Sequence, residues 1–258
     1  MKQMTARLMA LMISTTLLGA CMSTTAIGAG DSWKEEVLLH DGQKMMVERS
    51  QTYGGRSEPG QPPPAREVTI RFKPPGAANS ITWTSEYGDE LGRTNFNLLA
   101  LHIKQGTPYL VTEPNLCLSY NKWGRPNPPY VVFKHDAGTW QRIAVSELPA
   151  EFKTINMIVN NSRLYEIAES SKSAGYVTAD AVMKINSTLR QPEYKTILRE
   201  AYAGATNGCS EMIRTSDGWE GLGFFRLQKS HEACLQYCTR KGVNQSSCPC
   251  ESIFKGVK

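Results

Sequence analysis

Seven cysteines are the residues of this 258-residue chain whose type and spacing could most directly do chemistry. Cysteines form disulfides in an oxidising compartment, whereas in a reducing one they bind soft metal ions or act as nucleophiles. Cys21 ends an apolar N-terminal run. The other six lie further along the chain and are Cys117, Cys209, Cys234, Cys238, Cys248 and Cys250. An even number of cysteines in an exported chain indicates a disulfide framework.

The last four cysteines fall into two closely spaced pairs. Ser230 is a suitable N-cap for a short helix that carries Cys234 and Cys238, and helical residues four apart share a face with Cβ atoms roughly 5–6 Å apart. Cys248 and Cys250 are two apart in a segment expected to be extended, where they share a face at roughly 6.7 Å. Both separations exceed the ~3.5–4.5 Å between the Cβ atoms of a disulfide, so each cysteine should bond to a member of the other pair.

The order of the two pairs favours one bonding pattern. A single short turn separates them, so the helix and the extended segment should run antiparallel. That direction favours the nested bonds Cys234–Cys250 and Cys238–Cys248, and the offset bonds with exchanged partners are the alternative. A zinc site is a second alternative, because His231 shares the helix face of the first pair and either cysteine of the second pair could complete a tetrahedral set.

Cys117 and Cys209 are then left to bond each other. Such a bond would tie the β-rich part of the chain to the C-terminal segment. In the chain-entropy account, closing a loop of this length contributes ~4–5 kcal/mol to stability.

No fingerprint of a known catalytic or nucleotide-binding class occurs in the sequence. It contains no G-x-S-x-G, no H-E-x-x-H and no Walker or dinucleotide motif. Three histidines lie among expected strands and turns, at His40, His102 and His135. The adjacent acids at 35–36 and 89–90 should point in opposite directions and be solvated. The sequence therefore favours a protein without catalytic residues, cofactor or metal. A hydrolase with a dispersed active site is the alternative. One of these three histidines within hydrogen-bond reach of a carboxylate in a deep pocket would support it.

Residues 117–130, CLSYNKWGRPNPPY, combine aromatic, amide and cationic side chains on a backbone stiffened by proline. Such side chains form a low-entropy surface that can stack on a sugar ring or bind a peptide. The candidate ligand surface comprises Tyr120, Asn121, Lys122, Trp123, Arg125 and Tyr130. The alternative, which we favour, is a rigid crossover whose Trp123 and Tyr120 pack on the sheet. This stretch and residues 130–143 resemble an uncharacterised family of proteobacterial envelope proteins, and that resemblance implies no activity.

The first 21 residues have the composition of an export signal. Lys2 and Arg7 precede a mostly apolar run over residues 8–18, which is too short for a membrane-spanning helix. The run ends in LLGAC at residues 17–21, which resembles the lipobox of bacterial lipoprotein precursors. The resemblance implies removal of a signal peptide at residues 1–20 and attachment of acyl chains, such as palmitate, to Cys21. Cleavage by the ordinary signal peptidase near Ala29 is the alternative.

The residue after the expected lipidation site bears on the location of the protein. Among lipoproteins an aspartate there implies retention in the inner membrane, and this chain has Met22. The resemblance therefore implies a bacterial outer membrane location, with the protein facing the periplasm. The formal net charge is +5, and it falls to +3 when residues 1–20 are removed, which is too small to indicate nucleic acid binding. We expect membrane contact through the N-terminal lipid, an envelope protein or glycan as partner, and no nucleic acid.

Short β-type runs separated by glycine- or proline-containing turns dominate residues 33–152. Residues 155–159 could form a last strand, and residues 178–189 predict a helix with Thr178 as N-cap. The expected fold class is α+β, a mainly antiparallel β meander forming a sandwich or curved sheet, with one packed helix and a small disulfide-rich C-terminal helix–strand segment. The expected organisation is a signal peptide (1–20), a flexible tether (21–32), a β-rich domain (33–200) and a cysteine-rich segment (201–258). As a whole, the sequence predicts a non-catalytic envelope lipoprotein that acts as a binding or structural module.

Overall fold

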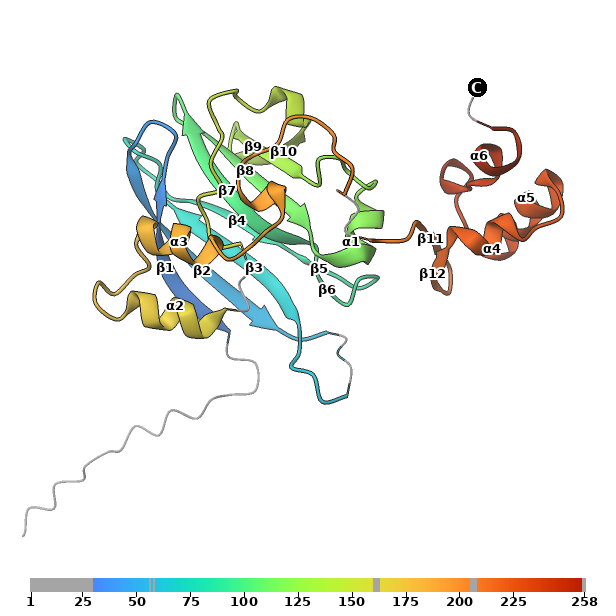
Figure 1. Ribbon diagram of the computed structural model, residues 1–258, viewed down its shortest axis with the longest axis horizontal. Helices are drawn as coiled ribbons and strands as arrows, with labels where there is room; N and C mark the ends of the chain where they lie inside the picture. Colours follow the sequence, from blue (N-terminus) through green and yellow to red (C-terminus); the bar gives the residue numbers. More distant parts are fainter. Residues whose placement is uncertain (1–29, 56, 58, 160–162, 205–207, 257–258) are drawn as a thin grey trace, which may run out of the picture.

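Two four-stranded antiparallel sheets face each other in the computed structural model, which describes residues 30–55, 57, 59–159, 163–204 and 208–256 (Figure 1). The first sheet follows the chain in order and consists of β1 (Asp31–Leu38), β2 (Lys44–Tyr53), β3 (Ala65–Phe72) and β4 (Ile81–Ser85). The second has the order β10-β9-β8-β7 and consists of β7 (Phe96–Lys104), β8 (Thr107–Pro114), β9 (Val131–Asp136) and β10 (Thr139–Ile143). The mainly antiparallel α+β fold expected from the sequence is confirmed.

The hairpins form where the turn residues predict them. Leu38 pairs with Lys44 across the turn that contains Asp41 and Gly42. The Asp41 carboxylate accepts a hydrogen bond from the Gln43 backbone nitrogen at 3.0 Å, and Gly42 adopts a φ of 84°, which suits glycine. Alternate side chains of the strands then point into the space between the sheets, because successive residues of a strand face opposite ways.

The main core fills the space between the two sheets. Val47 and Ile70 of the first sheet and Leu98 and Leu110 of the second belong to one cluster of buried side chains. Side chains also join the sheets along their open edges. The Trp140 indole on β10 donates to the carbonyl of Thr82 on β4 at 2.8 Å.

Asn156 joins the opposite edges of the sandwich. Its side-chain nitrogen donates to the carbonyl oxygens of Leu38 on β1 and Leu101 on β7, at 2.9 and 2.8 Å. Its side-chain oxygen accepts from the Leu101 backbone nitrogen at 2.9 Å. The expectation of a strand at residues 155–159 is wrong. The Met157 backbone nitrogen donates to the carbonyl of Leu99 at 3.1 Å, but the Asn156 side chain makes the neighbouring contacts to the sheets in place of a backbone ladder.

Two helices, where the sequence predicted one, pack beside the sandwich. They are α2 (Leu164–Ser171) and α3 (Ala179–Asn186). The Thr178 hydroxyl caps α3 by accepting from the Ala181 backbone nitrogen at 3.3 Å, as expected, although the helix ends three residues before Leu189. Buried residues of both helices pack with Trp33 of β1. The first strand begins at Asp31, inside the segment predicted as tether.

Shorter elements complete the chain around the sandwich. Before β7, a two-residue ladder pairs β5 (Tyr87–Gly88) with β6 (Arg93–Thr94). The short 3₁₀ helices η1 (Val145–Glu147) and η2 (Pro192–Tyr194) lie in the segments that follow the second sheet. No helix in the described part of the chain is long and apolar enough to cross a membrane.

Residues 209–256 form a separate group of elements, here called the C-terminal module, which projects from the sandwich (Figure 1). Its elements are β11 (Met212–Thr215), β12 (Gly218–Gly221), α4 (Leu222–Arg226), α5 (His231–Arg240), η3 (Gln245–Ser247) and α6 (Cys250–Phe254). Helix α5 starts at its Ser230 N-cap as predicted. The extended strand expected at Cys248 and Cys250 is wrong, because Pro249 lies between them, cannot donate to a ladder and precedes the first turn of α6.

Candidate functional site

The aromatic residues of the candidate ligand surface are largely packed against the protein. Its first half forms α1 (Leu116–Lys122), a helix that the sequence analysis did not predict. Tyr120 and Tyr130 are buried, and Trp123 is half-buried against the core between the sheets. The Trp123 indole donates to the side-chain oxygen of Asn95 at 3.2 Å. The favoured alternative, a rigid crossover packed on the sheet, therefore describes this segment.

The polar residues of the same surface bind the C-terminal module. Asn121 donates to the carbonyl of Ser210 at 3.0 Å and accepts from the backbone nitrogen of Met212 at 2.9 Å. Arg125 donates to the carbonyl oxygens of Cys209 and Ser210 at 3.0 and 3.2 Å. These four contacts satisfy backbone groups at the start of the module, so the amide and the guanidinium act in an internal interface.

A disulfide and a tryptophan hydrogen bond reinforce this interface. Cys117 of α1 is bonded to Cys209, as predicted, with their Cα atoms 5.2 Å apart. Lys122 forms an ion pair with Glu90 and donates to the side-chain oxygen of Asn95 at 2.9 Å. The Trp219 indole of the module donates to the carbonyl of Glu90 at 3.0 Å. Residues 117–125 thus form the anchor point of the C-terminal module.

The other four cysteines form two disulfides that touch each other. Cys234 is bonded to Cys250 and Cys238 to Cys248, which is the nested pattern that the sequence favoured. The Sγ atom of Cys250 lies 3.3 Å from that of Cys248 and 3.6 Å from that of Cys238. His231, a ligand in the predicted zinc alternative, instead has its Nε2 3.2 Å from a carboxylate oxygen of Glu251. The offset bonds are absent from this set of four.

The three remaining histidines do not assemble a hydrolase site. His102 is buried, its ring stacks on Phe152 at 4.8 Å, and its Nε2 donates to the carbonyl of Thr154 at 2.9 Å. Burial lowers the pKa of His102 to about 4. His40 packs edge-on against the same phenyl ring. Within the described residues, none of these three histidines forms a hydrogen bond or ion pair with a carboxylate, so the arrangement that would support a hydrolase is not found there.

Two buried acids and three tyrosines, none of which was predicted as a group from the sequence, lie together on the outer side of the second sheet. The Tyr194 hydroxyl donates to the Glu113 carboxylate on β8, with oxygen distances of 2.8 and 2.9 Å. The Tyr202 hydroxyl donates to Glu193 at 2.7 Å, and Tyr130 donates to the Glu193 carbonyl at 3.0 Å. Burial raises the pKa of Glu113 to about 7. We call these five residues the acid–tyrosine cluster, and they fasten the segment around η2 to the sheet.

The expectation that both acids at 35–36 are solvated is wrong for Glu35. Glu35 is fully buried and forms an ion pair with Arg49, which is also buried, at 3.1 Å. Trp33 donates to the same carboxylate at 3.0 Å, and Arg49 also donates to the carbonyl of Ile158 at 2.8 Å. Only Glu36 points outward, as predicted for an adjacent residue of a strand. The pair braces β1, β2 and the segment that crosses them.

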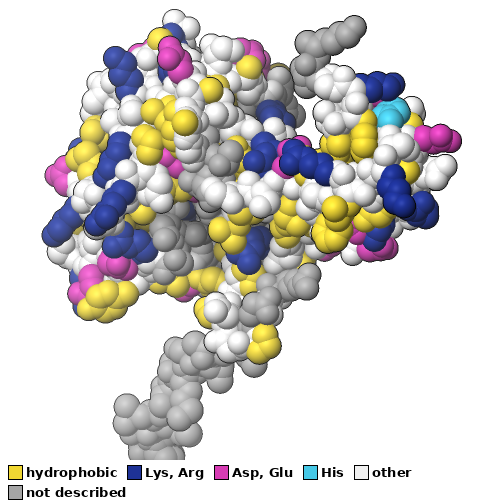
Figure 2. Space-filling model, turned by 45° about the vertical axis from the view of Figure 1, so that its right-hand side comes forward, with side chains coloured by type: hydrophobic (Ala, Val, Ile, Leu, Met, Phe, Trp, Pro, Cys, Tyr) yellow, Lys and Arg dark blue, Asp and Glu magenta, His cyan; other side chains and the backbone are white. Residues whose placement is uncertain are grey.

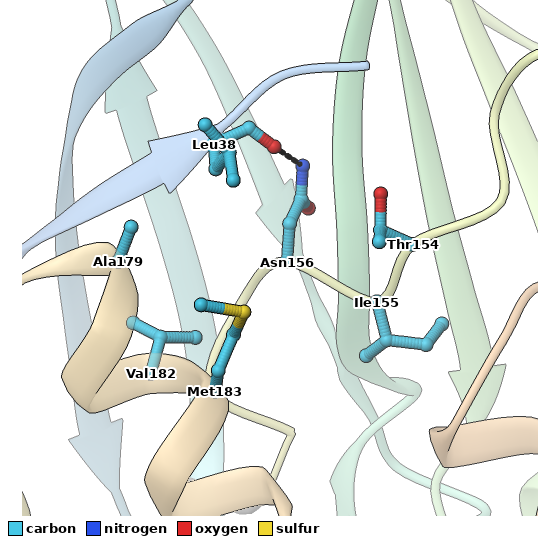
Figure 3. Close-up of a pocket in the computed structure, with 7 residues that line it drawn as sticks. All are labelled: Leu38, Thr154, Ile155, Asn156, Ala179, Val182 and Met183. Atoms are coloured by element: carbon cyan, nitrogen blue, oxygen red, sulfur yellow. Dashed lines mark hydrogen bonds between the residues drawn. The ribbon is translucent and has the colours of Figure 1, made fainter. Parts of the chain in front are cut away.

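A small cavity lies between β1, α3 and the segment around Asn156 (Figure 3). Its volume of about 20 Å³ is enough for a single water molecule. Its lining residues are Leu38, Thr154, Ile155, Asn156, Ala179, Val182 and Met183. The hydrogen bond from Asn156 to Leu38 closes one side of it. A cavity of this size and apolar lining holds no substrate.

The C-terminal module carries the other notable surface. Phe224 and Leu227, on and just after α4, are 56% and 78% exposed, and the basic residues Arg226 and Lys229 flank them. In Figure 2 apolar and basic side chains lie next to each other on the part of the molecule that projects to the right. Large exposed apolar side chains among basic ones are typical of contact surfaces.

Comparison with known protein families, with curated proteins and with solved structures finds no match to this chain. The predicted lipid attachment residue, Cys21, lies outside the described residues. The function is therefore inferred from the chain's own sequence and geometry.

Proposed function

We propose that this chain is a lipoprotein of the bacterial envelope, acylated at Cys21 and held at the periplasmic face of the outer membrane, where it acts as a non-catalytic binding or structural module. The observation that carries the proposal is the sequence LLGAC at residues 17–21, behind a short basic and apolar leader. Several acyl chains on one cysteine would make the attachment effectively permanent, because each buried methylene contributes ~0.8 kcal/mol.

The position of the first strand sets how far the body could lie from the membrane. β1 starts at Asp31, ten residues after Cys21. A fully extended chain spans at most ~3.3–3.6 Å per residue, so the start of β1 would lie within roughly 35 Å of the lipidated cysteine. The sandwich would therefore stay close to the membrane surface, with the C-terminal module projecting from it.

The C-terminal module is the part best suited to contact a partner. Its start is fixed to the sandwich by Cys117–Cys209 and by hydrogen bonds from Asn121 and Arg125. Little further conformational freedom would therefore be lost when the module binds a partner. Its exposed Phe224 and Leu227 supply apolar area for an envelope protein or glycan.

Site-specific crosslinking in the envelope tests the binding role. A photoreactive residue at Phe224 or Leu227 should give a discrete crosslinked product in intact cells. The same group at Tyr165, which is 75% exposed on α2, is the matched control and should give none. Equal products from both places, or none from the module, would argue against a contact role for the module.

A further inference from the structure

We propose that reduction of the C-terminal module opens a zinc site of four thiolates, formed by Cys234, Cys238, Cys248 and Cys250. In the oxidised protein these residues form two disulfides. In the reduced protein one Zn²⁺ would take the place of both bonds. All four ligands lie in the C-terminal module, so the site can be tested on protein that lacks the lipid anchor.

Three of the four sulfur atoms already lie close together, and the fourth is bonded to one of them. The Sγ atoms of Cys238, Cys248 and Cys250 are all within 4.8 Å of one another, and Cys234 is bonded directly to Cys250. Zn–S bonds of ~2.3 Å in a tetrahedron place sulfur atoms roughly 3.8 Å apart. The unbonded contacts to Cys250, at 3.3 and 3.6 Å, are close to that value. The two bonded pairs would have to move apart, and Cys234, which is outside the group of three, would have to move toward it.

The ligand types select the metal. Four thiolates in a tetrahedral arrangement favour zinc over the hard cations, which prefer oxygen ligands. The nearest imidazole, that of His231, lies beside the Glu251 carboxylate and is not one of the grouped ligand atoms. The site proposed here therefore consists of sulfur alone, unlike a zinc site that includes His231.

The C-terminal module has too small a core to stay folded without a cross-link, so a bound metal ion would stabilise its fold after reduction. Its buried core is small and consists of Phe225, Val243 and three of the four cysteines. Segments with so little apolar core usually depend on disulfides or a structural metal. Zinc bound to the reduced cysteines would replace the lost bonds and preserve α5 and α6, because binding to a structural site contributes directly to folding.

The exposure of the cysteines determines how reduction would begin. Cys248 is partly exposed, whereas its bonded partner Cys238 and the pair Cys234–Cys250 are buried. A dithiol reductant would attack the Cys238–Cys248 bond first, and after transfer of two electrons and two protons it would leave as a cyclic disulfide. A second dithiol would reduce Cys234–Cys250 in the same way. Zn²⁺ would then displace four protons from the four thiols.

Zinc titration of the purified full chain tests the proposal. Cys21→Ser serves as a common background that removes the unpaired thiol, and a phosphine reductant avoids competition from added thiols. With a chromophoric chelator as competitor, the reduced chain should bind one Zn²⁺ and the oxidised chain none. Cys117→Ser/Cys209→Ser is the matched control, because it removes the other disulfide and should still bind one. Cys248→Ser/Cys250→Ser should lose the stoichiometric zinc.

A second measurement separates a metal site from loss of folding. Trypsin should cut the reduced, zinc-free chain rapidly near Arg240 and Lys241, at the end of α5, and zinc should restore protection. Reduced protein that binds no more zinc than Cys248→Ser/Cys250→Ser would overturn the proposal. So would zinc uptake by the oxidised chain, or uptake that gives no protection from trypsin.

Discussion

Replacing Glu113 with glutamine should change how stability depends on pH. Burial raises the pKa of this carboxyl from 4.5 to about 7, against the smaller opposing effect of hydrogen bonds from Tyr194 and Asn97. Since each pKa unit is worth about 1.4 kcal/mol, the rise corresponds to about 3 kcal/mol. The folded-state pKa lies above the unfolded one, so the native state is relatively favoured below about pH 4.5. That advantage is lost as the pH rises through 7.

His102 works in the opposite direction over the same range. Burial lowers the pKa of His102 from 6.5 to about 4. Its contribution to the free energy of unfolding, about 3 kcal/mol, is therefore fully present above about pH 6.5 and is lost as the pH falls through 4. The contributions of these two residues nearly cancel in the wild-type protein. Glu113→Gln should leave the His102 contribution unopposed, and His102→Gln should leave that of Glu113.

Urea unfolding between pH 4 and pH 8, without reductant, measures both effects. The free energy of unfolding of Glu113→Gln minus that of the wild type should rise by about 3 kcal/mol from pH 4 to pH 8. For His102→Gln the corresponding difference should fall by a similar amount. A glutamine keeps the size of the Glu113 side chain and can still bond Tyr194. A difference that stays constant with pH would refute the account of the acid–tyrosine cluster given above.

Two further substitutions test other parts of the structure. Arg49→Met should lower the free energy of unfolding by about 3–5 kcal/mol, because it leaves Glu35 charged and buried without its partner. Arg49→Met/Glu35→Leu should recover most of that loss, and failure to recover would show that the pair itself is not the cause. Cys117→Ser/Cys209→Ser should lower stability by up to ~4–5 kcal/mol and speed release of the C-terminal module in limited proteolysis, with unchanged cleavage as the contrary result.

The hairpins could be predicted because their signals are local. Asp41-Gly42 and Gln105-Gly106 lie between apolar runs, and both glycines adopt positive φ angles in the structure. The nested disulfides were also predictable, although the segment at Cys248 and Cys250 is not a strand. Their pattern depends on the two segments running back along each other, and a helical turn after Pro249 preserves that order.

The polar interior could not be predicted in the same way, because its members are distant in sequence. Glu35 and Arg49 meet across the first hairpin, and only the register of that hairpin brings them together. Glu113 and Tyr194 are 81 residues apart, with no local pattern that links them. The helix at 116–122 was missed although Asn115 is a suitable N-cap residue, and in the structure the Asn115 side chain donates to the carbonyl of Thr94 instead of capping the helix.

The mass of the N-terminal peptide of the membrane-purified protein tests the central proposal most directly. We expect a mature protein that begins at Cys21 and carries diacylglyceryl on its sulfur and a further acyl chain on its amine. The Cys21→Ala precursor should carry no acyl chain and should not fractionate with the outer membrane. An unmodified N-terminus after Ala29, or acyl chains that persist in Cys21→Ala, would show that Cys21 is not the site of lipid attachment.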